Sequence, residues 1–359
     1  MLRKRWWGGV LHKYGLVLLL FAVCIGFSLD PATPAFATVA NIRFVLSNQA
    51  LTGIVALGMV FTLVVGEFDL SLGNIMSFAS CICAGVMFHA HAPLWLAILA
   101  SIGVGLGFGA VNGLIVTRLK VNSIVTTLGM LIIVTSMESW YTGGNSVTTG
   151  ISQGLLSIGY ARILGMPDPL IVLIVVAAIC WYVLEQTPLG RKLHAVGANP
   201  AAAGVLGLPV RRLTFISFVI GGLVVGFGGV LLIAVQGSAV PGVGQSYLFS
   251  ALAGAMLGAT TIRPGRFNVL GTLVAVYFLA FTVNGLTLSG GPSWVSSAFN
   301  GAALIVAVGI SVWSGSGPEG SVIMKDRGRE SNEVMLGAES SVVSSVEDGL
   351  GNTDQLLDS

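Results

Sequence analysis

Long apolar runs are the feature that most limits how this chain can fold. A helix needs about twenty mostly apolar residues to cross a bilayer, and the sequence contains ten such stretches. Only 9% of the 359 residues are charged, whereas a soluble domain carries roughly 25%. The sequence therefore predicts an all-α, polytopic transmembrane helical bundle embedded in lipid, and nothing in it suggests a nucleic-acid binder. The expected spans are residues 15–30, 48–65, 74–90, 93–116, 123–141, 168–187, 213–234, 246–262, 267–288 and 294–313.

Lysine and arginine set the expected orientation, because cytoplasmic loops retain positive charge. With the amino terminus inside, ten spans place 15 of the 17 basic residues in the cytoplasm and leave only Arg43 and Arg162 outside. An error of one span would scatter these charges over both faces. We therefore expect a multi-pass protein with both termini in the cytoplasm.

The start of the chain allows two interpretations. A basic segment, an apolar run from Gly15 and the sequence Ala35-Phe36-Ala37 are similar to a secretory signal with its cleavage site. Cleavage would leave nine spans and would not reverse the others. We favour a retained first helix.

The end of the chain has a different composition. Residues 319–359 contain 9 acidic and 3 basic side chains, and the stretch from Ser314 onward has only short apolar pairs. A segment of this kind cannot bury a core. We therefore divide the chain into a transmembrane domain, residues 1–313, and a disordered acidic cytoplasmic tail, residues 314–359.

A short motif occurs twice. Val111-Asn112-Gly113-Leu114 recurs as Val283-Asn284-Gly285-Leu286, and the offset of 172 residues also lays spans two to five on spans seven to ten. Partners in this mapping are five spans apart, so they cross the membrane in opposite directions. The sequence thus predicts an inverted repeat, as in transporters with a pathway between two halves. Coincidence between similar glycine-rich helices is the alternative.

Two carboxylates, Glu67 and Asp69, lie between the second and third spans with almost no loop around them. A carboxylate at bilayer depth is costly, so it has partners or faces an aqueous cavity. Asp69 or Ser71 can cap the third span by accepting its free N–H groups. We expect a capped helix break here, and lining of a pathway is the compatible alternative.

The loop 187–212 is the longest one on the cytoplasmic side. Asn199 is a favourable N-cap, Pro200 suits a first helical turn, and Gly207 is a natural stop. These residues predict a short helix outside the membrane, at about 199–207, with a small apolar surface. Such a helix suits a lever that presses into a partner's groove, and a passive connecting helix is the alternative.

Residues that would indicate an enzyme or a metal site are missing from the sequence. The four cysteines lie in apolar runs, and we interpret the four histidines as surface residues. There is no Gly-x-x-x-x-Gly-Lys-Ser/Thr loop to cradle phosphate, and no credible nucleophile–base pair. We therefore expect a protein that is not an enzyme and that holds neither a metal nor a cofactor.

Three stretches of the sequence resemble the membrane permease subunits of bacterial ATP-binding-cassette importers for ribose, xylose, galactose and related sugars. Residues 66–73, Gly-Glu-Phe-Asp-Leu-Ser-Leu-Gly, are similar to the family's Gly-Gly-x-Asp-Leu-Ser-x-Gly; residues 190–202 resemble its cytoplasmic coupling segment; and residues 284–286 resemble the start of its final hairpin. The likeness covers most of residues 40–313. Glu67, in place of a glycine, and Arg263-Pro264-Gly265 depart from the pattern.

This resemblance implies a permease in the bacterial inner membrane that imports a small sugar-like solute by alternating access. It also implies a homodimer or other permease pair, a cytoplasmic ATPase that uses the ATP, and an external solute-binding protein. The coupling residues would be Gly197, Asn199, Pro200, Ala201, Ala202, Ala203 and Gly207. The candidates for lining the pathway, each of which could instead make only an interhelical hydrogen bond, are Asp69, Ser71, Asn112, Thr126, Thr127 and Asn284.

Two other functions are consistent with a helical bundle of this kind. An ion-coupled secondary transporter could be built on the same repeat, with Glu67 and Asp69 as its only obvious ion-binding carboxylates. A membrane scaffold or receptor without transport is the third possibility.

Overall fold

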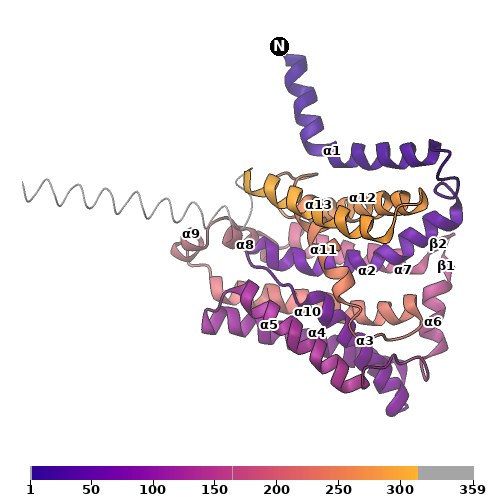
Figure 1. Ribbon diagram of the computed structural model, residues 1–359. Coiled ribbons are helices and arrows are strands. Elements are labelled where there is room, and N and C mark those ends of the chain that lie inside the picture. The colour runs from indigo at the N-terminus through magenta and orange to yellow at the C-terminus, as the bar shows by residue number, and fades with distance from the viewer. Residues whose placement is uncertain (1, 164, 314–359) are drawn as a thin grey trace, which may run out of the picture.

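The protein is a bundle of helices in the computed structural model, which describes residues 2–163 and 165–313 (Figure 1). Side chains are described for residues 13–163, 165–292 and 294–309. The predicted acidic tail, residues 314–359, lies outside the described residues. Two π-helical turns, η1 and η2, extend α4 and α7, and β1 pairs with β2 in a short antiparallel hairpin. The elements are α1 Leu2–Leu29, α2 Val39–Val64, α3 Leu72–His89, α4 Leu94–Leu114, η1 Ile115–Leu119, α5 Ser123–Thr142, α6 Gln153–Tyr160, β1 Arg162–Ile163, β2 Met166–Pro167, α7 Asp168–Trp181, η2 Tyr182–Gln186, α8 Pro188–Ala198, α9 Pro200–Val205, α10 Val210–Gln236, α11 Gln245–Gly258, α12 Val269–Leu288 and α13 Ser293–Trp313.

The predicted helical class is confirmed, and each of the ten predicted spans coincides with a helix. The count of ten spans is not confirmed. Within the described residues, seven helices are long and apolar enough to cross a membrane, namely α2, α3, α4 with η1, α5, α7 with η2, α10 and α12. The apolar parts of α1 and α13 are shorter, and α11 has only 14 residues.

The helices α2, α3 and α10 form the centre of the bundle, and more than 70% of the apolar stretch of each is buried. Helix α10 packs against α2, α3 and α4, while α2 packs against α7, α11 and α12. Helix α4 is equally apolar, but only 22% of its stretch is buried. Because apolar side chains gain nothing by leaving lipid for protein, packing between backbones decides which helices take the central places.

Glycines bring α4 and α10 into backbone contact. A Cβ atom on Gly105 would lie 2.1 Å from the carbonyl oxygen of Gly222, and one on Gly109 would lie 2.5 Å from that of Phe218. Ser101 adds a hydrogen bond of 2.8 Å from its hydroxyl to the carbonyl oxygen of Gly226. The glycine pairs at four-residue spacing in the two helices therefore interlock, as small residues do where membrane helices cross closely.

The helix boundaries follow the predicted repeat. An offset of 172 residues carries α2, residues 39–64, onto residues 211–236, and α10 occupies residues 210–236. It carries α3, α4 and α5 onto α11, α12 and α13 with boundaries that agree within three residues. The inverted orientation of the two halves stays a prediction.

Substituting Gly105 tests the crossing of α4 and α10. We expect Gly105→Ala to lower the melting temperature of the detergent-purified protein, because the new methyl group meets backbone that cannot rotate away, a strain of about 1–3 kcal/mol. Gly107→Ala in the same helix is the matched control, since its Cβ would meet no atom within 4 Å. The control should be neutral or slightly stabilising through helix propensity. Equal melting temperatures for the two variants would contradict this account of the crossing.

Candidate functional site

The predicted coupling segment folds as two short helices, α8 and α9. The side chain of Asn199 accepts a hydrogen bond of 3.0 Å from the backbone N–H of Ala202, and Pro200 starts α9. Gly207 follows the helix with φ of +80°, a backbone conformation that favours glycine. The predicted cap, helix and stop are thus confirmed. The separate helix α8 was not predicted, although Thr187 and Pro188 form the same cap pattern.

Helix α8 is fixed to the end of α2. Its side chains Leu193 and Val196 are buried. A Cβ atom on Gly197 would lie 1.8 Å from the carbonyl oxygen of Val64, the last residue of α2. The two backbones therefore touch, and α8 packs directly on the end of α2.

Helix α9 presents an apolar surface to the outside. Val205 and Leu206 are 89% and 81% exposed, and Ala201 and Ala202 are exposed beside them. Ala203 faces the opposite way and is only 2% exposed. The seven predicted coupling residues therefore separate by role: Gly197 and Ala203 anchor the segment, Asn199 and Gly207 shape it, and Pro200, Ala201 and Ala202 lie on its free surface.

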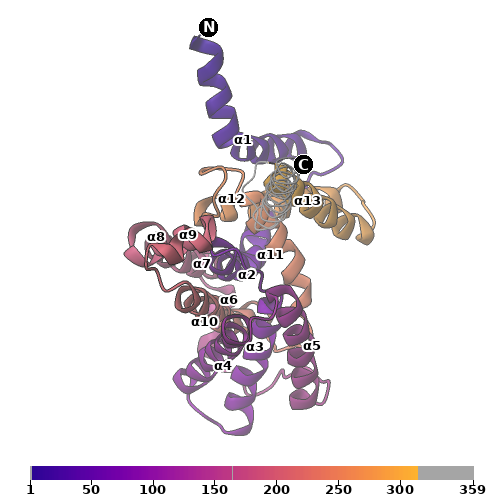
Figure 2. The ribbon, with the colours of Figure 1, turned by 90° about the vertical axis from the view of Figure 1, so that its left-hand side faces the viewer.

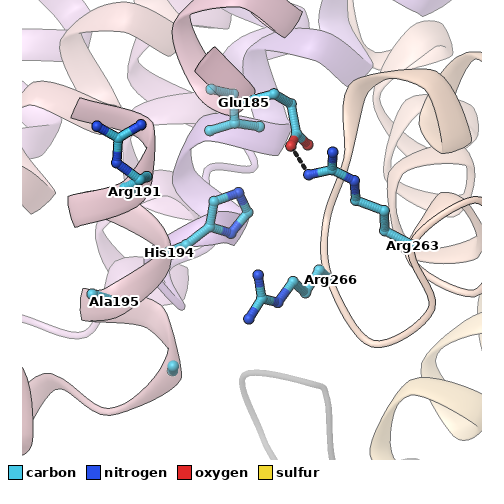
Figure 3. A pocket seen from close by; sticks show the side chains of 8 residues that line it. Glu185, Arg191, His194, Ala195, Arg263 and Arg266 are labelled. Carbon is cyan, nitrogen blue, oxygen red and sulfur yellow. Dashed lines mark hydrogen bonds and ion pairs between the residues drawn. The ribbon is translucent and has the colours of Figure 1, made fainter. Parts of the chain in front are cut away.

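A cleft of about 290 Å³ lies between α8 and the loop that joins α11 to α12 (Figure 3). The Glu185 carboxylate forms an ion pair with Arg263 across it, and the His194 ring lies between this pair and Arg266. Our sequence interpretation placed His194 on the surface, but the side chain is half-buried. Desolvation by burial, together with Arg266 and Arg263, lowers the pKa of His194 to about 4. The ring is consequently uncharged at neutral pH.

Three predicted pathway residues meet in one buried network, formed by Asp69, Ser71 and Asn112. The Asp69 Oδ1 atom accepts hydrogen bonds from the Ser71 backbone N–H at 3.0 Å and from the Ser71 hydroxyl at 2.6 Å. Asn112 Nδ2 donates to Ser71 Oγ at 2.9 Å and to Asp69 Oδ2 at 3.4 Å. All three side chains are at most 2% exposed. The network therefore ties the start of α3 to the end of α4.

The expected capping of α3 takes a different form. Ser71 occupies the N-cap position, but its side chain accepts no hydrogen bond from the first turn of the helix. The hydroxyl donates to Asp69 and accepts from Asn112 Nδ2, so its acceptor side is bonded to α4 and not to the first turn of α3. Asp69 therefore organises the turn that leads into α3 and does not cap the helix itself.

The turn after α2 is also bound to α5. The Phe68 backbone N–H donates to Ser123 Oγ at 3.2 Å. Thr127 Oγ1 lies 3.4 Å from the Phe68 carbonyl oxygen, to which it donates, and it also bonds back to the Ser123 carbonyl oxygen of its own helix at 2.8 Å. Thr127 is fully buried here, whereas Thr126 beside it only bonds back to the Asn122 carbonyl oxygen of its own helix. Of these two predicted residues, Thr127 belongs to the tertiary contact.

Asn284 lies apart from the other predicted residues. Its side-chain amide exchanges two hydrogen bonds, of 2.8 and 3.1 Å, with the amide of Asn41 at the start of α2. The structure therefore divides the predicted pathway residues between two places. Whether any of them lines a pathway stays a prediction.

The sequence reasoning gave no role to Glu138, a fully buried carboxylate of α5. Its Oε2 atom accepts a hydrogen bond of 2.9 Å from the backbone N–H of Gly242, 104 residues away in the chain. The bond joins α5 to the segment between α10 and α11. Within the described residues, no three His, Cys, Asp or Glu side chains lie close enough to share a metal ion.

Comparisons with known proteins show similarity to membrane permeases of import systems. The family described as "Branched-chain amino acid transport system / permease component" matches residues 41–308. Ribose import permease protein RbsC of Bacillus subtilis (strain 168) is 33% identical over 301 residues, which cover 84% of this chain and 92% of that protein. RbsC of Escherichia coli (strain K12) is 29% identical, covering 85% and 94%. Autoinducer 2 import system permease protein LsrD of Escherichia coli (strain SMS-3-5 / SECEC) is 30% identical, covering 82% and 92%.

Removing Asn112 tests the buried network. Asn112→Ala takes away the amide that donates to Ser71 and Asp69, and a buried polar group left without a partner costs about 1–3 kcal/mol. We expect a lower melting temperature in detergent. Asn145→Ala, at an exposed position, is the control and should leave the melting temperature unchanged. An unchanged value for Asn112→Ala would show that the network does not stabilise the fold.

The cleft predicts a specific loss of stability in acid. The folded protein holds the pKa of His194 at about 4, below the ordinary value of about 6.5. Between these two pH values the unfolded chain therefore binds the proton more readily than the folded protein does. The stability contribution of His194 is present above pH 6.5 and declines as the pH falls toward 4. Melting temperatures at pH 7 and pH 5 should therefore differ less for His194→Gln than for the unaltered protein. The control is His91→Gln, at an exposed histidine, and it should keep the full difference.

Proposed function

Because the chain belongs to the branched-chain amino acid transport system / permease component family, we propose that it is the membrane subunit of an ATP-binding-cassette importer. The observation that carries the proposal is the exposed apolar surface of α9, held by α8 on the end of α2. Contiguous exposed apolar groups outside a membrane span mark an interface with a partner. Such a surface suits contact with a partner protein whose movement would displace α9.

The partner that we propose for this surface is a cytoplasmic ATPase. The chain has no phosphate-cradling loop of its own, so ATP would be bound and hydrolysed by that partner and this subunit would be a transport component without a cofactor. Ala201, Ala202, Val205 and Leu206 would fill an apolar groove on the ATPase.

The packing supplies a route from this surface into the membrane. Force on α9 would reach α8, and the contact between Gly197 and Val64 would carry it to α2. Helix α2 packs on α7, α10, α11 and α12 at the centre of the bundle. A small displacement at α9 could therefore shift a large part of the molecule between inward-facing and outward-facing states.

The arrangement of the two predicted repeats supports a pathway of the alternating-access kind. Helix α2 of the first repeat packs against α11 and α12 of the second, and α10 of the second packs against α3 and α4 of the first. The first helix of each repeat thus packs against the second and third helices of the other repeat. This reciprocal packing is expected of two repeats related by a pseudo-twofold axis. We propose that two such permease chains, identical or paired, together form the pathway.

Basic residues at the two ends of the bundle support an orientation in the membrane. Arg191, Arg263 and Arg266 lie together at the end that carries α8. At the other end, Arg43 Nε donates to the carbonyl oxygen of Gly165, in the turn that joins the strand with Arg162 to β2. We propose that the α8 end faces the bacterial cytoplasm, with both termini there, and that the protein lies in the inner membrane.

The proposed substrate is a small sugar or a sugar-like solute, because two of the relatives above are named ribose import permeases. An external solute-binding protein would deliver it. Reconstitution in proteoliposomes with both partner proteins tests the whole proposal. Uptake of labelled ribose should require ATP and survive dissipation of ion gradients, and the opposite pattern would show an ion-coupled transporter.

The structure sharpens the choice of an uncoupling variant. Ala203 is buried, so a charge there would disturb α9 itself, whereas Ala202 is exposed on the proposed contact surface. Ala202→Glu should reduce ATP-driven uptake by about tenfold or more, since an unpaired charge in an apolar contact costs more than the ~1.4 kcal/mol of one tenfold step. Ala202→Ser is the conservative control, and the amount of inserted protein is compared by size-exclusion chromatography. Normal uptake by Ala202→Glu would rule out α9 as the coupling surface.

A further inference from the structure

The cleft beside α8 contains more positive than negative charge. Arg191, Arg263 and Arg266 contribute guanidinium groups, and Glu185 is the one carboxylate among the lining residues. The Glu185 side chain is only 4% exposed and is already paired with Arg263. With His194 uncharged, the cleft has two positive charges in excess.

Two of these guanidinium groups have no acidic partner among the described side chains. The Arg191 side chain makes a long hydrogen bond within the described part of the chain, 3.5 Å from Nη1 to the carbonyl oxygen of Gln186. Arg266 makes no side-chain hydrogen bond or ion pair within the described part of the chain and points into the open cleft (Figure 3). The two guanidinium groups without an acidic partner lie on different walls of the cleft, Arg191 on α8 and Arg266 on the loop between α11 and α12, and guanidinium groups bind carboxylates well.

The chain itself contains such a segment. Residues 330–359 contain seven acidic side chains and no basic one, including the adjacent pair Glu347 and Asp348. They are joined to α13 by residues 314–329, and sixteen residues can span at most about 55 Å. The end of α13 lies at the left-hand end of the bundle in Figure 1, the end that also carries α8 and α9, and Figure 2 agrees.

We propose that the acidic segment of residues 330–359 docks in the cleft formed by Arg191, His194, Arg263 and Arg266. The segment belongs to the same molecule, and its linker starts at the end of the bundle that carries the cleft. Its local concentration at the cleft is therefore high. Docking adds carboxylates beside His194 and crosslinks α8 to the loop between α11 and α12. A docked segment would also restrain the helix that couples to the ATPase, and this consequence alone rests on the proposed function.

Cysteine crosslinking in the full-length protein tests the docking directly. Ala195 lines the cleft, so the pair Ala195→Cys and Ser345→Cys should form a disulfide under mild oxidation. The matched control pairs Ser345→Cys with Ala202→Cys, since Ala202 is exposed on the α9 surface away from the cleft. Three of the four native cysteines are buried, and the variants with a single added cysteine give the background.

Charge reversal identifies the interaction that holds the segment. Arg191→Glu with Arg266→Glu should reduce the crosslinking yield about tenfold, which corresponds to ~1.4 kcal/mol, and 0.5 M salt should do the same. Combining the charge-reversed cleft with Glu347→Lys and Asp348→Lys in the segment should restore the crosslinking yield.

Three results would overturn the proposal. One is a yield for the Ala195 pair that does not exceed the Ala202 pair. Another is a yield that does not respond to charge reversal or salt. The third is the absence of any crosslink, together with slower modification of the single Ala195→Cys variant by a thiol reagent when millimolar inorganic phosphate is present. That result would assign the cleft to free anions. Because the readout is crosslinking in detergent, it is independent of whether the protein transports a sugar.

Discussion

Backbone contact between helices is the interaction on which the rest of this structure depends. In lipid, apolar side chains have no strong reason to prefer another helix over a hydrocarbon tail. Helix α10 reaches the centre of the bundle because glycines at its crossing with α4 remove the side chains that would hold the two helices apart. Once α10 is fixed there, it fills the space between α2, α3 and α4. The polar contacts at the ends of the helices are then formed between elements that are already in place.

The same principle operates at the edge of the membrane, where it joins an exposed segment to the core. At Gly197 the backbone of α8 touches the last residue of α2, and at Gly190 it approaches the carbonyl oxygen of Leu184. A helix attached through flexible side chains could move without its neighbour, but one in backbone contact cannot. The proposed coupling relies on this contact, which joins α8 to a long buried span.

Sequence reasoning predicted the features that depend on neighbouring residues. The apolar runs located the helices, and the Asn199-Pro200 cap and Gly207 stop located α9, because these signals act within one or two helical turns. Contacts between distant residues could not be predicted. Asn284 was grouped with Asn112 because both are polar residues inside predicted spans, yet it pairs with Asn41, 243 residues away. His194 appeared to be a surface residue because the arginines that enclose it lie about seventy residues further along the chain.

The hydrogen bonds and glycine contacts also indicate which helices can move as a unit. Asp69, Ser71 and Asn112 join α3 to α4, Asn74 donates to Thr135 of α5 at 2.8 Å, and the glycines join α4 to α10. Helix α2 packs with α7, α11 and α12 as well as with α10. These contacts define two groups of helices, α3, α4, α5 and α10 in one and α2, α7, α11 and α12 in the other, and each contains helices from both predicted repeats. The groups meet where α2 packs on α10, and also where a Cβ atom on Gly244, at the start of α11, would lie 2.1 Å from the carbonyl oxygen of Gly73 in α3. Where α2 packs on α10, a Cβ atom on Gly58 would lie 3.1 Å from the Gly221 carbonyl oxygen, a looser approach than the 2.1 Å between α4 and α10. Under the proposed coupling, α8 would shift the end of α2 across this looser contact with α10, while the contact of Gly73 with Gly244 would keep α3 attached to the start of α11.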